Sequence, residues 1–410
     1  MKVSVLTLGC RVNQAESSVI EASLEANGIN LVTLNDNPDY CVVNTCSVTA
    51  KSDYTSRQLI RRAAKAGAKV IVTGCYSHLK KDEVRNMPRV TELVDNTRKY
   101  DIVNIITGRE NHLVFSHHTR SRPHLKVQEG CNFNCSYCTV PLARGRSKSI
   151  PLQEILERVL SIEVAGYNEV VLTGVHLGSY GLDLPEKISL NHLIKSILKS
   201  SNIKRIRLSS LEINEVDDEL VELMQDVRLC RHIHLPLQSG SEKVLELMRR
   251  NYTLSSFSSK INKIVSKVDN IAVGSDMIVG FPGEGDEEFK STYAFLKAMP
   301  FTYLHIFPYS ERPDTDAARM KDKIRSSIIK RRLTLLLELS KEKKASYLER
   351  QLRSALDVII EEKTCDGHVI GTSGNYIKVL IPATTARKGS IVFVKPLRVS
   401  DNRIEGSIIP

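Results

Sequence analysis

Short apolar segments alternate with helical patterns along most of the chain, and this alternation is the feature that most restricts its fold. In the first part, apolar segments at 3–8, 41–44 and 70–72 are separated by helical patterns near 15–27 and 49–66. Strands that alternate with helices in this order form parallel sheets covered by helices. We therefore predict an α/β protein that begins with an open parallel sheet.

A second series of alternating segments follows a polar, basic stretch at 117–122. Its strand-like segments are 124–128, 169–172, 205–209, 232–237, 271–279 and 303–307, with helical patterns between them. Six such units predict an open or partial (βα)6 barrel of the TIM type. Its active face would be formed by the carboxyl ends of the strands.

The last part of the chain changes character twice. Residues 319–353 form a helical pattern with twelve Lys or Arg against four Asp or Glu. This basic stretch is either a surface that binds nucleic acid or an ordinary solvated helix face. In residues 354–410, apolar and polar residues alternate with period two in short segments that are separated by Gly and Pro. This pattern predicts a small antiparallel β-barrel. We expect three domains, at 1–116, 117–345 and 346–410.

Charge and cysteine content narrow the function. A formal net charge of +11 favours a polyanionic partner, because Lys and Arg that face phosphates release counterions. No apolar run approaches the ~20 residues that span a bilayer, and the chain opens on a strand pattern rather than a signal peptide. We expect a cytoplasmic protein without a membrane partner, in which nine cysteines serve metal binding or catalysis instead of disulfides.

Cys131, Cys135 and Cys138 form a Cys-x3-Cys-x2-Cys motif directly after the first strand of the second series. Three thiolates on one loop can ligate three irons of a [4Fe-4S] cube, whereas ferredoxins usually close the cube with a fourth cysteine. The open iron can hold S-adenosylmethionine (SAM) and deliver one electron to its sulfonium. The alternatives are a zinc knuckle or a thioredoxin-like Cys-x-x-Cys, but no Cys or His pair lies nearby at zinc spacing.

Cys10, Cys46 and Cys75 each follow the carboxyl end of an apolar strand in the first series. In open α/β sheets this edge is where ligands bind, so we expect the three thiols to meet there. Three buried structural cysteines are the alternative. We assign structural roles to Cys41, Cys230 and Cys365, which lie in or beside apolar strands or a helix end without partner spacing.

The segments 7–17, 44–49 and 73–75, together with the central cysteine motif and Tyr137, resemble the radical SAM methylthiotransferases over essentially the whole chain. This resemblance implies a metal-binding enzyme that inserts sulfur at an unactivated C–H bond. It implies two [4Fe-4S] clusters, of which the Cys10, Cys46, Cys75 trio would hold the one that carries the transferred sulfur. It also implies SAM as cofactor, an electron donor such as flavodoxin or ferredoxin, and a sulfur donor.

Polar residues at the strand ends are candidates for binding SAM. They are Thr173, Gly174, Ser209, Ser210, Glu212, Gln238 and Ser239. An ordinary strand-end turn or helix cap is the alternative for each of them. The segments 235–241 and 276–284 are similar to family motifs. We expect His117, His118 and His176 to be surface or core residues and not ligands.

Three substrate classes are associated with the family: isopentenyladenosine in tRNA, threonylcarbamoyladenosine (t6A) in tRNA, and an aspartate of a ribosomal protein. The segments 8–14, 141–147 and 173–181 favour the t6A branch, and the C-terminal barrel resembles a TRAM domain, which binds RNA. The resemblance therefore implies tRNA processing at C2 of t6A at position 37 in the anticodon stem-loop. One departure is Arg312-Pro313-Asp314-Thr315, where Gly is more frequent before Thr.

The working hypothesis uses two SAM molecules. One methylates a sulfur held by the N-terminal trio, and the other is cleaved at the central trio to a radical that removes hydrogen from C2 of an unstacked adenine. A non-enzymatic alternative is an iron-sulfur protein that binds RNA or transfers electrons. Such a protein would release no 5'-deoxyadenosine from SAM.

Overall fold

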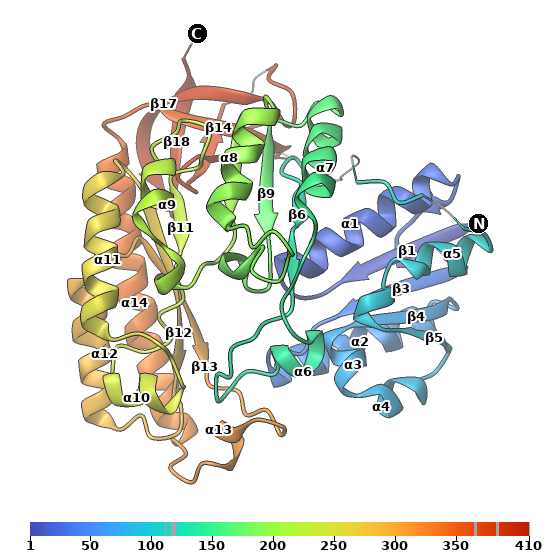
Figure 1. The fold of residues 1–410 in the computed structure, drawn as a ribbon, viewed down its shortest axis with the longest axis horizontal. Helices are drawn as coiled ribbons and strands as arrows, with labels where there is room; N and C mark the ends of the chain where they lie inside the picture. Colours follow the sequence, from blue (N-terminus) through green and yellow to red (C-terminus); the bar gives the residue numbers. More distant parts are fainter. Residues whose placement is uncertain (111, 116–119, 365–366, 383–384, 410) are drawn as a thin grey trace.

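The computed structural model of the chain describes residues 1–409 except 111, 116–119, 365–366 and 383–384. The chain forms an N-terminal sheet, a central partial barrel and a C-terminal closed barrel, in the order of the sequence (Figure 1). The α/β fold class predicted from the alternation is confirmed. No helix within these described residues combines the length and the apolarity needed to cross a membrane.

The N-terminal sheet has five parallel strands in the order β2-β1-β3-β4-β5. They are β1 (Lys2–Thr7), β2 (Asn30–Leu31), β3 (Tyr40–Thr45), β4 (Lys69–Gly74) and β5 (Val90–Val94). One face packs on α1 (Arg11–Ala26) and α5 (Asp101–Thr107), and the other on α2 (Ala50–Lys65), α3 (Cys75–Leu79) and α4 (Lys81–Arg85). Because β1, β3 and β4 are parallel neighbours, their carboxyl ends meet at one edge.

The central unit is a partial barrel of two three-stranded parallel sheets, β6-β9-β10 and β11-β12-β13. Its strands are β6 (His124–Lys126), β9 (Glu169–Thr173), β10 (Arg205–Leu208), β11 (His232–His234), β12 (Ala272–Val279) and β13 (Tyr303–Pro308). A bridge between Ile206 and Leu229 and a hydrogen bond from Leu211 N to His234 O, 3.0 Å, join the two sheets. The six predicted strands therefore form one curved wall.

Helices cover the outer face of this wall, and short elements lie at its ends. The outer helices are α7 (Leu152–Val164), α8 (Leu190–Ser200), α9 (Asp218–Leu223), α10 (Glu242–Leu247), α11 (Leu254–Lys267), α12 (Asp286–Ala298) and α14 (Ser326–Gln351). The short helices α6 (Val140–Arg144) and α13 (Asp316–Arg319) pack against the N-terminal domain and the central cysteine loop, respectively, and β7 (Gln128–Glu129) and β8 (Lys148–Ser149) form a small hairpin. The predicted domain boundary at residue 346 lies inside α14, and the one at 116/117 lies outside the described residues. The division into three domains therefore stays a prediction.

The C-terminal strands close into a barrel in the order β14-β15-β16-β18-β17. They are β14 (Leu356–Lys363), β15 (Val369–Ser373), β16 (Lys378–Ile381), β17 (Ile391–Ser400) and β18 (Arg403–Ile408). The predicted small barrel is confirmed, but β16 and β18 run parallel. A closed ring with an odd number of strands must contain at least one parallel pair, so a fully antiparallel arrangement is impossible here.

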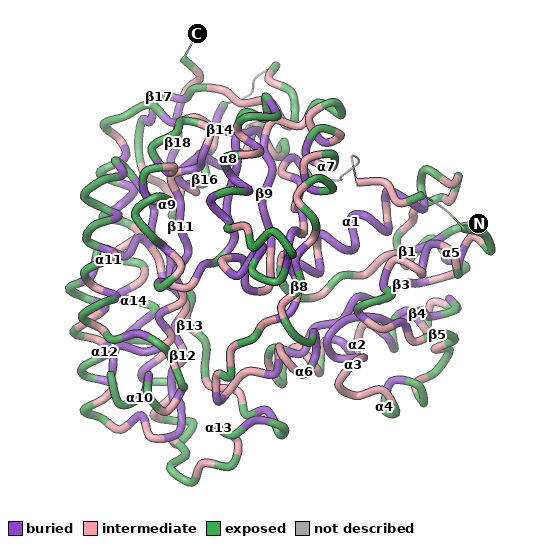
Figure 2. The backbone as a smooth tube through the Cα atoms, in the orientation of Figure 1, coloured by how far each residue is buried: buried purple, intermediate pink, exposed green. Residues whose placement is uncertain are grey.

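A buried ionic cluster attaches the C-terminal barrel to the amino ends of the central strands. Glu169, the first residue of β9, is fully buried and pairs with Arg205 and Arg207 of β10. These two arginines also donate to backbone carbonyls of the C-terminal barrel, at Asp357, Thr372, Ser373 and Gly374, over 3.0–3.2 Å. Figure 2 shows β9 as a fully buried strand beneath this junction.

We predict that Glu169→Gln destabilises the protein in a pH-dependent way. Burial alone would raise the pKa of Glu169, but Arg207, Arg205 and Arg122 lower it to about 2. Because the folded-state pKa is depressed, the stabilisation is present above pH ~4.5 and is lost as the pH falls towards 2. The loss from breaking a buried ion pair is about 3–5 kcal/mol near neutral pH.

Thermal or denaturant unfolding of both proteins from pH 7 to pH 3 tests this prediction. The difference between wild type and Glu169→Gln should shrink as the pH falls. Glu222→Gln, at an exposed position of α9, is the matched control and should leave stability unchanged. Equal stability of wild type and Glu169→Gln at pH 7 would contradict the assigned role of Glu169.

Candidate functional site

Cys10, Cys46 and Cys75 lie at the shared carboxyl edge of β1, β3 and β4. Two glycines permit the close approach of their loops. A Cβ on Gly9, whose φ is +120°, would lie 3.0 Å from the Cβ of Cys46, and a Cβ on Gly74, whose φ is +103°, would lie 2.3 Å from the carbonyl oxygen of Thr45. The sheet edge and these glycines together hold the three cysteines in one place, as the sequence predicts.

Two buried asparagines hold the loops that carry the first two cysteines. The Nδ2 of Asn13 donates to the carbonyls of Leu8 and Thr45, both over 2.9 Å. The Nδ2 of Asn44 donates in turn to the carbonyl of Asn13 over 3.0 Å. The loops after β1 and β3 are therefore tied to each other through side chains and do not depend on cysteine ligation for their position.

Cys131, Cys135 and Cys138 lie on the loop between β7 and α6, all half-buried. The amide of Cys138 donates to the carbonyl of Cys135 over 3.1 Å, which curls the loop. Gly130, with φ +71°, precedes the loop where a Cβ would come within 2.0 Å of the Arg146 carbonyl oxygen. The loop therefore presents three thiols from a compact turn.

The donor chemistry of both trios fits an iron-sulfur cluster. All eight cysteines in the described residues carry free thiols. Burial raises the pKa of Cys138 to about 12 and that of Cys46 to about 11, so these groups are protonated thiols until a metal displaces the proton. Three thiolates on a short loop match three irons of a [4Fe-4S] cube with one iron left open.

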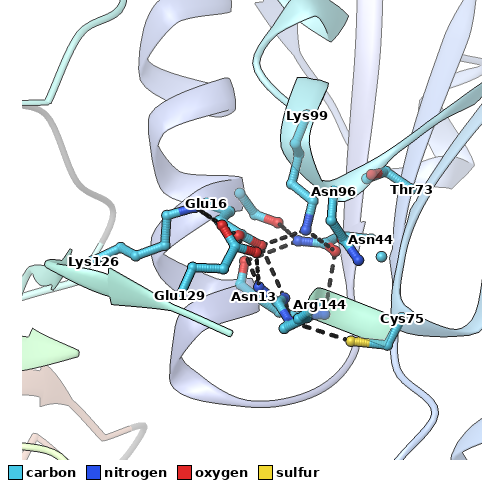
Figure 3. Close-up of polar contacts among 12 residues, drawn as sticks. Asn13, Glu16, Asn44, Thr73, Cys75, Asn96, Lys99, Lys126, Glu129 and Arg144 are labelled. Atoms are coloured by element: carbon cyan, nitrogen blue, oxygen red, sulfur yellow. Dashed lines mark hydrogen bonds and ion pairs between the residues drawn. The ribbon is translucent and has the colours of Figure 1, made fainter. Parts of the chain in front are cut away.

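Arg144 extends from the helix after the central trio to Cys75 of the N-terminal trio; Figure 3 shows its contacts with Cys75, Asn13, Glu16 and Glu129. It is the last residue of α6, the helix that starts two residues after Cys138, and it reaches into the N-terminal sheet domain. There its Nε donates to the Sγ of Cys75 over 3.3 Å, and its Nη2 donates to the Oδ1 of Asn13 over 2.6 Å. The central cysteine loop is thus fixed relative to the N-terminal cysteines by one short helix.

Glu16 is the centre of this network. It is fully buried in α1 and pairs with Lys99, with Lys126 of β6 over 2.9 Å, and with Arg144 over 3.1 Å. Burial alone would raise the pKa of Glu16, but Lys126, Lys99 and Arg144 hold it well below its usual range. Glu129 also accepts from Arg144, over 2.7 Å. The carboxylate therefore stays ionised and binds three segments together.

Two further side chains contact the central loop. The Nη1 of Arg250 donates to the Sγ of Cys135 over 3.4 Å, and the same guanidinium pairs with Glu212. The Nδ1 of His176 lies 3.8 Å from the Sγ of Cys131, and its other nitrogen pairs with Glu215. His176 is buried, as expected of a core histidine, but its contact with Cys131 was not predicted.

The predicted SAM-binding residues fall into two groups. Near the cysteine loop, Gly174 N donates to the hydroxyl of Ser209 over 3.4 Å, which joins the ends of β9 and β10, and Glu212 holds Arg250. Thr173 is buried at the end of β9, where its hydroxyl donates to the Val171 carbonyl over 3.0 Å.

The other candidates have different surroundings. Ser210 is exposed, and Gln238 is half-buried with a positive φ of +68°. Ser239 is buried with its hydroxyl 3.4 Å from that of Thr292 on α12, so it serves the packing of that helix. None of these seven residues is shown to bind SAM, and their assignment stays a prediction.

The remaining residues singled out from the sequence have structural surroundings. Cys41 and Cys230 are buried, whereas Cys365, His117 and His118 lie outside the described residues. Arg312, in the segment that departs from the family pattern, is buried and donates to Ser47 Oγ and Asp53 Oδ2, both over 2.8 Å. This segment therefore braces the loop after Cys46.

Comparisons with known proteins agree with this geometry. The model of the radical SAM superfamily matches residues 125–296, and that of uncharacterized protein family UPF0004 matches residues 2–95. The fold is similar to that of the radical SAM methyltransferase TsrM from Kitasatospora setae, with a TM-score of 0.57 at 15% identity over 77% of each chain. The central wall and its cysteine loop thus define a radical SAM enzyme.

Sequence relatives are more specific. The chain is 38% identical to threonylcarbamoyladenosine tRNA methylthiotransferase MtaB of Aquifex aeolicus, over 88% of this chain and 93% of the relative. The MtaB protein of Bacillus subtilis is 35% identical, over 99% and 96% of the two chains. The tRNA-2-methylthio-N(6)-dimethylallyladenosine synthase of Fervidobacterium nodosum is 30% identical, over 100% and 99%. The chain belongs to the radical SAM methylthiotransferase family, and the enzyme class predicted from its motifs is confirmed.

The family implies SAM and one [4Fe-4S] cluster, and the two trios predict a second. We expect about eight iron atoms per chain after anaerobic reconstitution and about four after replacement of Cys131, Cys135 and Cys138 by Ala. This triple variant should also cease to cleave SAM. Iron analysis and chromatography of 5'-deoxyadenosine measure both quantities.

Cys230→Ala is the matched control, since this buried cysteine lies outside both trios and should leave the iron content near eight. A wild-type content near four iron atoms per chain would show that the protein holds one cluster and not two. Retained SAM cleavage by the triple variant would contradict the role of the central loop.

Proposed function

We propose that this enzyme adds a methylthio group to C2 of t6A at position 37 of tRNA. The observation that carries the proposal is the pairing of two cysteine trios, joined by Arg144, in a chain that is 38% identical to a t6A methylthiotransferase over nearly its full length. The relative that acts on dimethylallyladenosine is less similar, at 30% identity.

The central trio would hold the cluster that cleaves SAM. When bound, this cluster supplies the electron that breaks a C–S bond of SAM and yields the 5'-deoxyadenosyl radical. Arg250 and His176 contact two of the three sulfurs and can donate N–H groups to them. Donors to cluster sulfurs stabilise the reduced state, because it carries the larger negative charge.

The N-terminal trio would hold a second cluster and the sulfur to be transferred. Its support is the identical donor set, the glycines that bring the loops together and the cationic Arg144 beside Cys75. The Glu16 network fixes this trio against the central loop, so that both groups would face one substrate without a domain movement. An external sulfur donor and an electron donor of the flavodoxin or ferredoxin type complete the reaction, and we place it in the cytoplasm.

The C-terminal barrel offers a surface for the tRNA. On β17, Phe393 and Leu397 expose 62% and 59% of their surface, and Lys395 lies between them on the same side of the strand. An aromatic ring beside a cation suits an unpaired base and its phosphate. The basic stretch 319–353 is less uniform than its sequence indicates, because Arg332 is buried in ion pairs with Glu284 and Asp286.

We predict that tRNA affinity falls with salt and that β17 carries part of this dependence. Phe393→Ala with Lys395→Glu should weaken binding by about 10-fold and reduce the log–log salt slope by about 1. The comparison variant is Lys330→Glu with Arg331→Glu on exposed positions of α14. A larger effect of the α14 variant would indicate that tRNA binds mainly to the basic helix. If neither variant changes the affinity, neither surface binds tRNA.

The most direct test of the activity separates its two chemical steps. Replacing Cys10, Cys46 and Cys75 by Ala should leave 5'-deoxyadenosine formation intact and abolish 2-methylthio-t6A in tRNA, because only the sulfur-carrying group is lost. Nucleoside mass spectrometry of the tRNA and chromatography of the SAM products, from one anaerobic reaction, measure both outcomes.

Wild-type enzyme with t6A-bearing tRNA is the positive control, and tRNA that carries isopentenyladenosine is the competing substrate. If only isopentenyladenosine is methylthiolated, the proposed substrate is wrong and the enzyme belongs to the other tRNA branch of the family. Persistent methylthiolation by the triple variant would make the N-terminal cysteines structural.

A further inference from the structure

The strands β11, β12 and β13 have an apolar face and a polar face. Ile233, Met277 and Leu304 belong to the apolar core that packs against the outer helices. The alternate positions His234, Asp276 and His305 therefore face the opposite, concave side of the wall. No role in cluster binding or in binding SAM has been assigned to these three residues.

The three polar side chains form one hydrogen-bonded group. A single oxygen of Asp276, Oδ1, lies 3.0 Å from the Nε2 of His234 and 3.2 Å from the Nδ1 of His305. The hydroxyl of Tyr303 lies 3.3 Å from the other ring nitrogen of His234. Gly274 is required at this point, because a Cβ there would lie 2.1 Å from the Tyr303 ring.

This group borders a space that is open to solvent. The side chain of His305 is 53% exposed and that of Asp276 is 27% exposed, although both lie on strands of the wall. Phe307, two residues after His305 and on the same side of β13, is 45% exposed. An exposed aromatic ring next to hydrogen-bonding side chains is an arrangement that binds a nucleobase with a polar substituent.

The concave face lies next to both cysteine loops. Arg11, the residue after Cys10, donates to the hydroxyl of Tyr376 over 3.2 Å, and the Tyr376 ring lies 4.3 Å from that of His232 on β11. Ile278, two residues after Asp276, and Tyr137 of the central loop both pack against one small apolar cluster that includes Phe281. Two residues of a strand span about 7 Å, so the polar group lies on the same strand as, and close to, the apolar cluster on which the central loop packs.

We propose that His234, Asp276 and His305 bind the hydrophilic N6 substituent of the target adenosine and select threonylcarbamoyl over an apolar group. This inference rests on the proposed function. His305 supplies a donor to the carbamoyl or hydroxyl oxygen through Nε2, its second ring nitrogen, and Phe307 stacks on the base. Asp276 accepts from the ring N–H groups of His305 and His234. His234, whose two ring nitrogens contact Asp276 and the Tyr303 hydroxyl, acts as a positioning residue that holds Asp276 and through it His305. Arg11, which donates to the Tyr376 hydroxyl beside His232, would hold the threonyl carboxylate.

Selection follows from the cost of unpaired polar groups. A site built to hydrogen-bond a substituent rejects an analogue without the matching groups, because its own donors and acceptors lose water and gain nothing. An isopentenyl group offers no acceptor to His305. A threonylcarbamoyl group offers a carboxylate, a hydroxyl and a urea-like carbonyl, which match the imidazole and guanidinium donors.

The test compares two substrates with the full-length, anaerobically reconstituted enzyme. We measure kcat/KM for methylthiolation of tRNA that carries either t6A or isopentenyladenosine at position 37. His305→Leu and His234→Leu should each lower the value for t6A by about 10- to 100-fold, mainly through KM, and change the isopentenyladenosine value by much less. His305→Gln, which keeps a donor, should recover part of the loss.

His192→Leu, at an exposed position of α8, is the matched control and should leave both values unchanged. If wild type does not methylthiolate t6A at all, the proposed function fails. If wild type does so but the ratio of the two kcat/KM values is the same in His305→Leu and His234→Leu, the inference fails and the proposed function stands. Metal analysis of each variant adds a further outcome, because loss of a bound ion beyond the cluster iron would make the trio a metal site and overturn the inference.

Discussion

The architecture depends on one buried carboxylate. Glu16 has no access to solvent, and an unpaired carboxylate in that position would not remain ionised. Its three cations come from separate parts of the chain: Lys99 from the N-terminal domain, Lys126 from β6 of the central wall, and Arg144 from the helix after the central cysteine loop. A single charge therefore requires all three segments to assemble around it. Because Arg144 also reaches Cys75, the same assembly sets the relation between the two cysteine trios.

A second buried carboxylate joins two domains at the amino ends of the central strands. Glu169 neutralises Arg205 and Arg207, and these arginines cap carbonyls of the C-terminal barrel. Buried ion pairs add little net stability compared with apolar packing, but removing one partner leaves an uncompensated charge. They therefore restrict the way in which the domains can meet. The two networks fix the N-terminal sheet and the C-terminal barrel on either side of the concave face, which leaves that face open between them.

The central strands carry function on one face and stability on the other. Outward residues such as Ile233 and Met277 are buried against helices, whereas on the concave face His305 and Asp276 reach solvent and His234 is buried beside them. Polar groups at strand centres are costly unless they are paired, and here each is paired with the next. The pairing holds the side chains in place before a substrate arrives. Recognition of a polar substituent then requires little further ordering.

The sequence by itself determined the βα order, the two cysteine trios and the strand ends on which they lie, because hydrophobic periodicity and cysteine spacing are local properties. It also indicated the small closing barrel, although not its parallel pair. The contacts of Arg144, Arg250 and His176 were decided by the tertiary structure alone. Arg144 and Cys75 are far apart in the chain, and only the packing of α6 against the N-terminal sheet brings them within 3.3 Å. The polar face of β11–β13 could not be predicted from the sequence either, because the sequence of a strand does not show whether a histidine faces a helix or an open space. Register and curvature decide that direction, and both arise from long-range strand pairing.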